Sequence, residues 1–230
     1  TVANFLVPLL RDGRYTVAQK KRAGRMAASF KGVHYPKSVI LYAVYFYVRY
    51  AVSYRDLEEI MAERGVDVDH ATLNRWVVKF STDLAAEAQK LKRQTANSWR
   101  MDETYVQIKG QWAYLYRAVD RDGRTLDFML SAKRDKAAAR RFFKRAISTN
   151  GTPDRVAIDK SGANLAGLKA VNVIRKFAGN GWLIQIMQSK YLNNMVEQDH
   201  RFIKRITRAT LGFKAFHSAA ATLAGIETAH

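Results

Sequence analysis

The hydrophobic pattern of this chain changes at about residue 97. Before that point, apolar residues recur three and four positions apart, as they do in amphipathic helices. After it come three runs rich in aromatic and β-branched residues, SWRMDETYVQI, QWAYLYRAV and TLDFMLSA. Lys109-Gly110 and Arg121-Asp122-Gly123 separate these runs, and glycine-containing connections of this kind are typical of hairpin turns. The pattern therefore predicts a helical segment followed by three consecutive antiparallel strands.

Alternating helix and strand patterns complete the chain. Helices are expected at 135–149, 163–177 and 194–208, and strands at 155–158 and 182–187. In the second of these helices we expect Leu165, Leu168, Val171 and Ile174 to be buried. The order βββαβαβα predicts an α/β fold, a ribonuclease-H-like mixed sheet with helices packed on it. We expect this domain to span residues 97–230.

The preceding segment, residues 36–96, is predicted to be a small all-α domain with helices at 38–50, 54–64 and 70–80. Ser53 and Asp69 stand where N-caps are expected, and Gly65 follows the last turn of the middle helix. A supporting helix, a tight turn and a second helix with a polar face are typical of a helix-turn-helix DNA-binding domain. A three-helix bundle that binds no DNA has the same apolar pattern.

The outward face of the 70–80 helix carries polar side chains that can reach base edges or phosphates. We expect the following residues to contact DNA: His70, Thr72, Asn74, Arg75 and Lys79.

The chain is strongly basic, with 39 Lys and Arg against 20 Asp and Glu and a net charge of +19. A basic arm over residues 1–35 carries +6, residues 36–96 carry +1, and residues 97–230 carry +12. Such a charge indicates a polyanionic partner, nucleic acid first and an anionic membrane surface second. Most of this charge lies outside residues 36–96, the segment that is expected to recognise a DNA sequence.

Two further features exclude classes of protein. The longest apolar run, Val39 to Val48, has 10 residues, about half of the roughly 20 that a spanning helix needs, so we expect a buried helix and no membrane partner. The chain has no cysteine, which excludes disulfide scaffolds and thiol catalysis and fits a reducing compartment such as the bacterial cytoplasm.

Three acidic residues stand at positions that suggest chemistry. Asp102 lies inside the first predicted strand, where aspartate is uncommon, and Asp159 ends the fourth strand. Glu197 lies on the last predicted helix. Because the first and fourth strands are neighbours in a ribonuclease-H-like sheet, the two aspartates are expected to converge, with Glu197 packed across the same edge. Glu103 would point to the opposite face of the sheet and is left out of this group.

Converging carboxylates repel one another unless a cation lies between them. Hard oxygen ligands favour Mg²⁺, with Mn²⁺ as the alternative, and two such ions would clamp the oxygens of an in-line displacement at phosphorus. Each acid also has an ordinary interpretation: Asp102 as an edge residue, Asp159 as a helix N-cap, and Glu197 as a solvated helical acid.

Cations follow the glutamate on the same helical face. Arg201, Lys204 and Arg208 come four, seven and eleven positions after Glu197 and are expected to contact DNA. The 133–145 segment is expected to supply sequence-independent phosphate contacts through Lys133, Arg134, Lys136, Arg140, Arg141, Lys144 and Arg145. A solvated basic face has the same pattern.

Three sequence blocks carry a family resemblance: SYRDLEEIMAERGVDVDHATLNRWV, WRMDETYVQIKGQWAYLYRAVDRDGRTLDF and KYLNNMVEQDHRFIKR followed by LGFKAFHSA. They closely resemble the DDE transposases of bacterial insertion sequence family six, and the likeness runs from about Phe30 to the C-terminus. The resemblance implies that Asp102, Asp159 and Glu197 are the catalytic triad and that residues 54–80 recognise terminal inverted repeats. It further implies Mg²⁺-dependent cleavage of double-stranded DNA and transfer of 3′-OH ends into target DNA by a homodimer or larger oligomer.

Two other functions fit the same residues. One is a catalytically degenerate copy that binds the element ends as a repressor, and the other is a ribonuclease-H-like nuclease that cuts without joining. From the resemblance we also expect Met26 to be the natural start and the chain to be shortened at its C-terminus.

Overall fold

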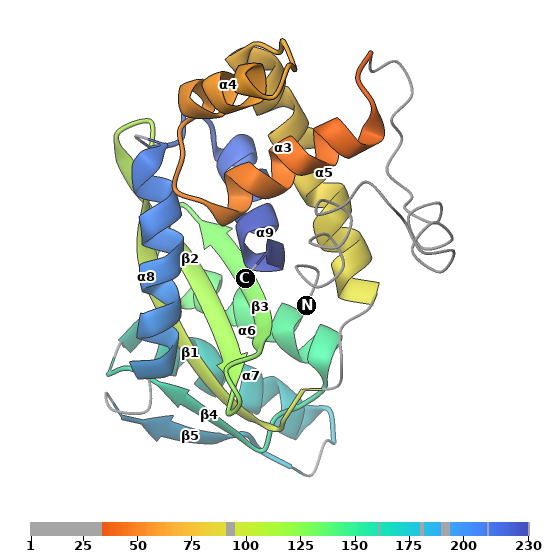
Figure 1. Cartoon of the computed structure of the whole chain (residues 1–230). Coiled ribbons are helices and arrows are strands. Elements are labelled where there is room, and N and C mark those ends of the chain that lie inside the picture. The colour runs from red at the N-terminus through yellow and green to blue at the C-terminus, as the bar shows by residue number, and fades with distance from the viewer. Residues whose placement is uncertain are drawn as a thin grey trace. The chain divides into compact units, whose positions relative to one another are not determined.

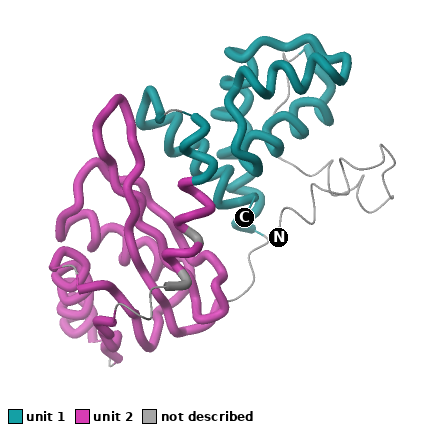
Figure 2. Tube along the Cα trace, turned by 60° about the vertical axis from the view of Figure 1, so that its left-hand side comes forward, with its two compact units in different colours: residues 1–92, 205–230 teal, residues 93–204 magenta. Residues whose placement is uncertain are grey.

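The structure is a computed structural model that describes residues 34–90, 95–160, 162–179, 182–189, 194–210 and 212–229. The chain divides into two compact units, residues 1–92 with 205–230 and residues 93–204 (Figure 2). Nearly all of the predicted basic arm, and the expected start at Met26, lie outside the described residues.

The first unit is built from helices, of which α3 (Lys37–Arg49) and α4 (Tyr54–Glu63) begin and end close to the predicted positions. Helix α5 (His70–Lys90) begins where it is predicted to begin, and α9 (Phe216–Ala229) is not among the predicted helices. Ser53 caps α4 in a reciprocal capping box with Asp56, and Gly65 follows the helix with a φ of 74°. The predicted Asp69 cap is also confirmed, since its carboxylate accepts a 2.9 Å hydrogen bond from the Thr72 amide.

The apolar run at 39–48 forms the buried helix α3. Helix α5 continues ten residues beyond its predicted end at residue 80, and its second half buries Ser81 and Leu84. The element that covers this second half is α9, which is distant in sequence and packs against both α5 and α3. Gly225 of α9 allows this approach, since a Cβ there would lie 2.6 Å from the Ser81 Oγ.

The second unit contains a five-stranded mixed sheet in the order β3-β2-β1-β4-β5 (Figure 1). The strands are β1 (Ser98–Ile108), β2 (Gln111–Asp120), β3 (Thr125–Ser131), β4 (Arg155–Ile158) and β5 (Gln185–Gln188). The first three are antiparallel, and β4 pairs in parallel with both β1 and β5. The β1–β2 turn uses Lys109 and Gly110 at φ of 50° and 75°, the backbone that a two-residue hairpin requires.

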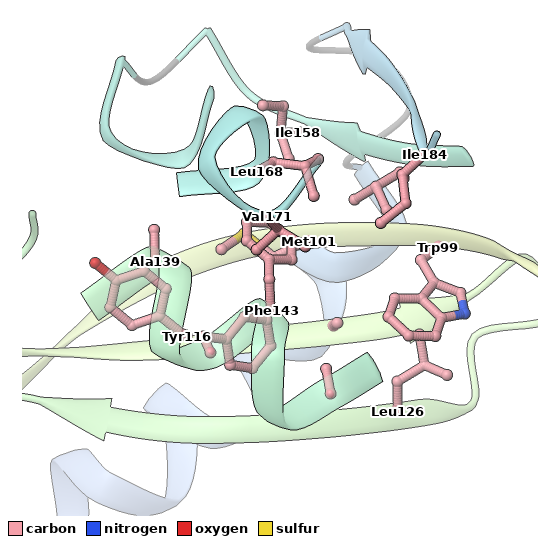
Figure 3. Close-up of a cluster of buried hydrophobic side chains, with 14 of the residues drawn as sticks. Trp99, Met101, Tyr116, Leu126, Ala139, Phe143, Ile158, Leu168, Val171 and Ile184 are labelled. Carbon is pink, nitrogen blue, oxygen red and sulfur yellow. The ribbon is translucent and has the colours of Figure 1, made fainter. Parts of the chain in front are cut away.

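Helices cover the sheet of the second unit. They are α6 (Lys136–Asn150), α7 (Gly162–Phe177) and the part of α8 (Asn194–Ala209) up to residue 204. Figure 1 shows α6 and α7 on one face and α8 along the other. Figure 3 shows the core between the sheet and α6 and α7, where Met101 and Tyr116 meet Phe143 and Leu168.

The ribonuclease-H-like element order is confirmed, with one error in the predicted burial. Leu168 and Val171 of α7 are buried, but Ile174 is exposed. The last turns of α7 extend past the core, and Val173 and Phe177 are exposed there as well. The compact units place α9 with the helices of the first unit. The division into domains at 36–96 and 97–230 stays a prediction.

Candidate active site and nucleic-acid interface

Asp102 and Asp159 are brought together by the pairing of β1 with β4. The parallel register joins Trp99 to Val156 and Arg100 to Ala157. If this register is continued by two residues beyond Arg100 and Ala157, Asp102 lies beside Asp159. Burial raises the pKa of Asp102 to about 7, and the nearby charges of Glu103, Asp159 and Glu197 contribute to the rise. The two predicted aspartates and Glu197 are therefore close enough to interact electrostatically.

Glu197 lies in the first turn of α8 and is exposed. In the described part of the chain, no group of three or more His, Asp or Glu side chains is close enough to hold a metal ion. The metal-binding and catalytic roles of the three acids thus stay predictions, which rest on their carboxylate chemistry and on the electrostatic interaction of Glu197 and Asp159 with Asp102.

A hydrogen-bonded network holds Asp159 from the other face of the sheet. The buried Glu103 accepts hydrogen bonds from the Arg134 Nε and, at 2.6 Å, from the Asn164 Nδ2. The same two residues reach Asp159: Arg134 Nη2 lies 3.4 Å from Oδ2, and Asn164 Nδ2 lies 3.2 Å from Oδ1. Although burial lowers the pKa of Arg134, the carboxylates of Glu103 and Asp159 raise it overall. Both oxygens of Asp159 are therefore positioned by side chains that Glu103 orients.

The α8 side of Asp102 is buried against His200. The His200 Nδ1 lies 3.6 Å from the Asp102 Oδ2. Burial, together with the positive charges of Arg117 and Lys204, lowers the pKa of His200 to about 3. His200 is therefore neutral near pH 7 and does not form an ion pair with Asp102. Arg117, directly opposite Asp102 on β2, is itself buried.

The expected DNA-binding face of α8 is open to solvent. Arg201, Lys204 and Arg208 are all exposed, on the same helix as Glu197. Of the seven cations at 133–145, however, two make bonds within the protein. Arg134 binds Glu103 and Asp159, and Arg145 forms a 2.7 Å ion pair with Asp127. These two side chains stabilise the second unit, because each lies beside an acidic group of another element.

The polar face of α5 is organised from its first turn. Asp69 accepts hydrogen bonds from the Thr72 amide and, at 2.7 Å, from the Thr72 hydroxyl, which in turn accepts from Arg75 Nη2 at 2.6 Å. His70 Nδ1 lies 3.0 Å from the Glu58 carboxylate of α4. The remaining candidates, Asn74 and Lys79, are exposed. Arg75 is thus held in one orientation on an accessible surface.

Comparison with known proteins gives the family. Residues 96–230 match the profile of a DDE domain, and residues 34–153 match that of the transposase IS66 family. A transposase for insertion sequence-like element IS431mec from Staphylococcus aureus is 42% identical over 199 residues, which cover 86% of this chain and 85% of the relative. The chain belongs to the DDE transposases of insertion sequences.

A second relative of this transposase gives the same family. The transposase for insertion sequence element IS257 in transposon Tn4003, also from Staphylococcus aureus, is 42% identical with the same coverage. Among solved structures, the HTLV-2 integrase catalytic core domain in complex with magnesium aligns with 59% of this chain and 86% of that chain, at 17% identity and a TM-score of 0.43. No helix in the described part of the transposase has the length and apolar character needed to cross a membrane.

Sequence reasoning missed three residues of this site: Arg134, Asn164 and His200. The charge pattern predicts a DNA contact for Arg134, and the sequence predicts no role for Asn164 or His200. The sequence did hold a signal for the partners of Glu103. An acidic side chain that points from a strand into a core needs a hydrogen-bonding partner there. Its partners lie 31 and 61 residues away, so spacing could not identify them.

Proposed function

We propose that this transposase binds the terminal inverted repeats of an insertion sequence and catalyses metal-dependent strand cleavage and 3′-OH strand transfer at Asp102, Asp159 and Glu197. The observation that carries the proposal is the β1–β4 register, which brings Asp159 beside Asp102 on a DDE domain. The electrostatic influence of Glu197 on Asp102 supports adding the third acid.

The acid group suits a hard divalent cation. Asp102 is partly buried, and burial followed by the charges of the neighbouring carboxylates raises its pKa. Its ionised form is therefore stabilised by a bound cation, and carboxylate oxygens suit a hard divalent ion. Asp102, Asp159 and Glu197 would hold Mg²⁺ or Mn²⁺, in two sites. Such ions, when bound, supply Lewis-acid stabilisation of the attacking and departing oxygens.

The protein side chains perform the remaining tasks. Arg134 and Asn164 fix both oxygens of Asp159, so that this acid needs little reorganisation when the substrate binds. Arg201, Lys204 and Arg208 offer positive charge to a phosphate backbone that approaches Glu197.

Two displacements at phosphorus account for the products. In the first, a water oxygen attacks the phosphorus at the element end, the bond to the 3′ oxygen breaks, and a 3′-OH and a 5′-phosphate form. In the second, that 3′-OH attacks a phosphodiester of the target duplex and releases a target 3′-OH, so the number of phosphodiester bonds is unchanged. Neither step requires a covalent link between protein and DNA.

The helix-turn-helix over α4 and α5 supplies sequence recognition in this proposal. Arg75 is oriented by Thr72 and Asp69, which suits a bidentate contact to a guanine in the major groove. Two ends must be cut and joined together, so we propose that a homodimer or larger assembly acts on DNA in the bacterial nucleoid.

The test is incubation of the protein with end-labelled inverted-repeat duplex and Mg²⁺, with nicked and joined products scored separately. The expected result is both products, with Asp159→Asn abolishing both while end binding persists. End binding without any metal-dependent product would indicate a repressor, and nicks without joints would indicate a nuclease.

A further inference from the structure

Three aromatic rings gather at the end of the β1–β2 hairpin. Tyr105 and Tyr114 are directly opposite each other in the antiparallel register, and Trp112 lies two residues before Tyr114 on the same face. The Tyr105 ring centroid lies 5.3 Å from that of Tyr114 and 6.1 Å from that of Trp112, where the rings meet edge to face. We call Tyr105, Trp112 and Tyr114 the aromatic platform.

The aromatic platform continues the core of the second unit into solvent. Tyr114 packs partly buried against that core, whereas Tyr105 is 48% exposed and Trp112 is 62% exposed. Cross-strand contact between Tyr105 and Tyr114 stabilises a hairpin. Grouped exposed apolar side chains such as these indicate a binding surface.

The hairpin lies beside the proposed catalytic acids. Strand β1 continues six residues past Asp102, whereas β4 ends at Ile158, so the hairpin projects beyond the edge where Asp159 lies. Tyr105 lies on the face of β1 that carries Glu103, opposite the face that carries Asp102. The aromatic platform therefore approaches the acids through Arg134, which interacts electrostatically with Tyr105 and whose Nη2 lies 3.4 Å from the Asp159 Oδ2.

Basic residues lie near the aromatic platform. Tyr105 is close enough to Arg134 to influence its charge, and Lys109 occupies the hairpin turn. Lys133 is also exposed and follows Ser131, the β3 residue paired with Tyr114. An occupant with a flat ring and a negative charge matches this surface, and a nucleotide has both.

We propose that the aromatic platform binds an unpaired base of the DNA strand next to the phosphate that is cut, with the base stacked on Trp112. A base within a duplex has both faces covered by its neighbours, so only an unpaired base can offer a face to the indole. The proposal rests on the proposed function in taking DNA as the substrate and the three acids as the place of cleavage. It adds a subsite that selects unpaired nucleotides.

Tryptophan fluorescence gives a test without metal or chemistry. Trp76 and Trp99 are buried, so the tryptophans that a ligand can reach among the four in the chain are Trp112 and Trp182, which is 86% exposed. In full-length Trp182→Phe protein, a short oligo(dT) should quench the emission of Trp112. Trp112→Ala should weaken oligo(dT) binding by about 5- to 150-fold, the range for loss of one base–aromatic stack, and should change binding of fully paired DNA less than twofold.

Two matched variants keep the test decisive. Trp182→Ala removes a more exposed tryptophan elsewhere in the same unit and should leave oligo(dT) affinity unchanged, while Trp112→Phe should retain most of it. Equal oligo(dT) affinity in Trp112→Ala and the parent would overturn the proposal. So would a change of oligomeric state in Trp112→Ala without a loss of oligo(dT) binding, which would make the aromatic platform a protein interface. Failure to bind any DNA would instead overturn the proposed function.

Discussion

The Arg134 Nη2 lies 3.4 Å from the Asp159 Oδ2, and the Nε of the same guanidinium donates a hydrogen bond to the buried Glu103. Glu103, the neighbour of Asp102 in sequence, thus influences Asp159 through Arg134. This arrangement makes Glu103 a positioning residue whose loss should affect chemistry more than DNA binding.

Glu103→Gln should lower the rate of end cleavage by about 10- to 100-fold, a typical effect of removing a partner that orients a metal ligand. The reason is that Arg134 and Asn164 lose the charge that fixes them against Asp159. Steady-state cleavage and end-binding affinity, measured side by side, check this. Asp122→Asn is the control, since the ion pairs of Asp122 with Arg121 and Arg124 are exposed and 3.7 Å long, and their loss should have no effect. Equal cleavage by Glu103→Gln and the parent protein would rule out the positioning role.

The raised pKa of Asp102 predicts how stability changes with pH in metal-free solution. Because the folded pKa of about 7 exceeds the ordinary 3.8, the folded protein holds a proton between these values that the unfolded chain has lost. The contribution of this group to the free energy of unfolding should therefore fall by about 1.4 kcal/mol per pH unit as pH rises from 4 to 7. Asp102→Asn should remove this dependence and stabilise the protein at pH 8. Urea unfolding with EDTA at several pH values measures it, and an unchanged slope in the variant would disprove the assignment.

Arg75 and Lys79 on α5 should separate base recognition from phosphate binding. Arg75→Ala should weaken binding to the cognate repeat by about 1–3 kcal/mol and reduce discrimination against a scrambled repeat. Lys79→Ala should weaken binding to both sequences alike and reduce its salt dependence. Titrations of the two DNAs at several salt concentrations compare them. Equal losses on both DNAs for Arg75→Ala would exclude direct base recognition by this residue.

The contact between α6 and α7 should respond sharply to one methyl group. A Cβ at Gly167 would lie 2.6 Å from the Ala139 Cβ and 3.0 Å from the Arg140 amide nitrogen. Gly167→Ala should therefore destabilise the protein by about 1–3 kcal/mol, although alanine is the better helix former. Gly162→Ala in the same helix meets nothing within 4 Å and should be neutral or stabilising. Thermal unfolding of the pair measures the difference, and equal melting temperatures would show that the helices move apart at little cost.

Local features of the sequence predict much of this fold. The Ser53 and Asp69 caps, the Gly65 stop and the Lys109-Gly110 turn each depend on a few neighbouring residues, and all are found as expected. The place of Asp159 beside Asp102 was also predictable, because the strand order brings β1 and β4 together.

Features that depend on distant partners were not predictable from local pattern. Helix α5 continues to Lys90 because α9, more than a hundred residues later, covers it. Glu103 was excluded because strand alternation points it away from Asp102, and that direction is correct. Its link to Asp159 runs through Arg134, in the loop before α6, and Asn164, in the first turn of α7.

A change of metal preference tests the central claim most directly. The chain has no cysteine, so Asp159→Cys introduces its only thiolate, which binds Mg²⁺ poorly and softer ions such as Mn²⁺ better. We predict that Asp159→Cys loses inverted-repeat cleavage in Mg²⁺ and regains a measurable part of it in Mn²⁺, while Asp154→Cys, at the opposite end of β4, cleaves in both. Full activity of Asp159→Cys in Mg²⁺, or a folded, DNA-binding variant that Mn²⁺ does not rescue, would contradict a metal-binding role for Asp159.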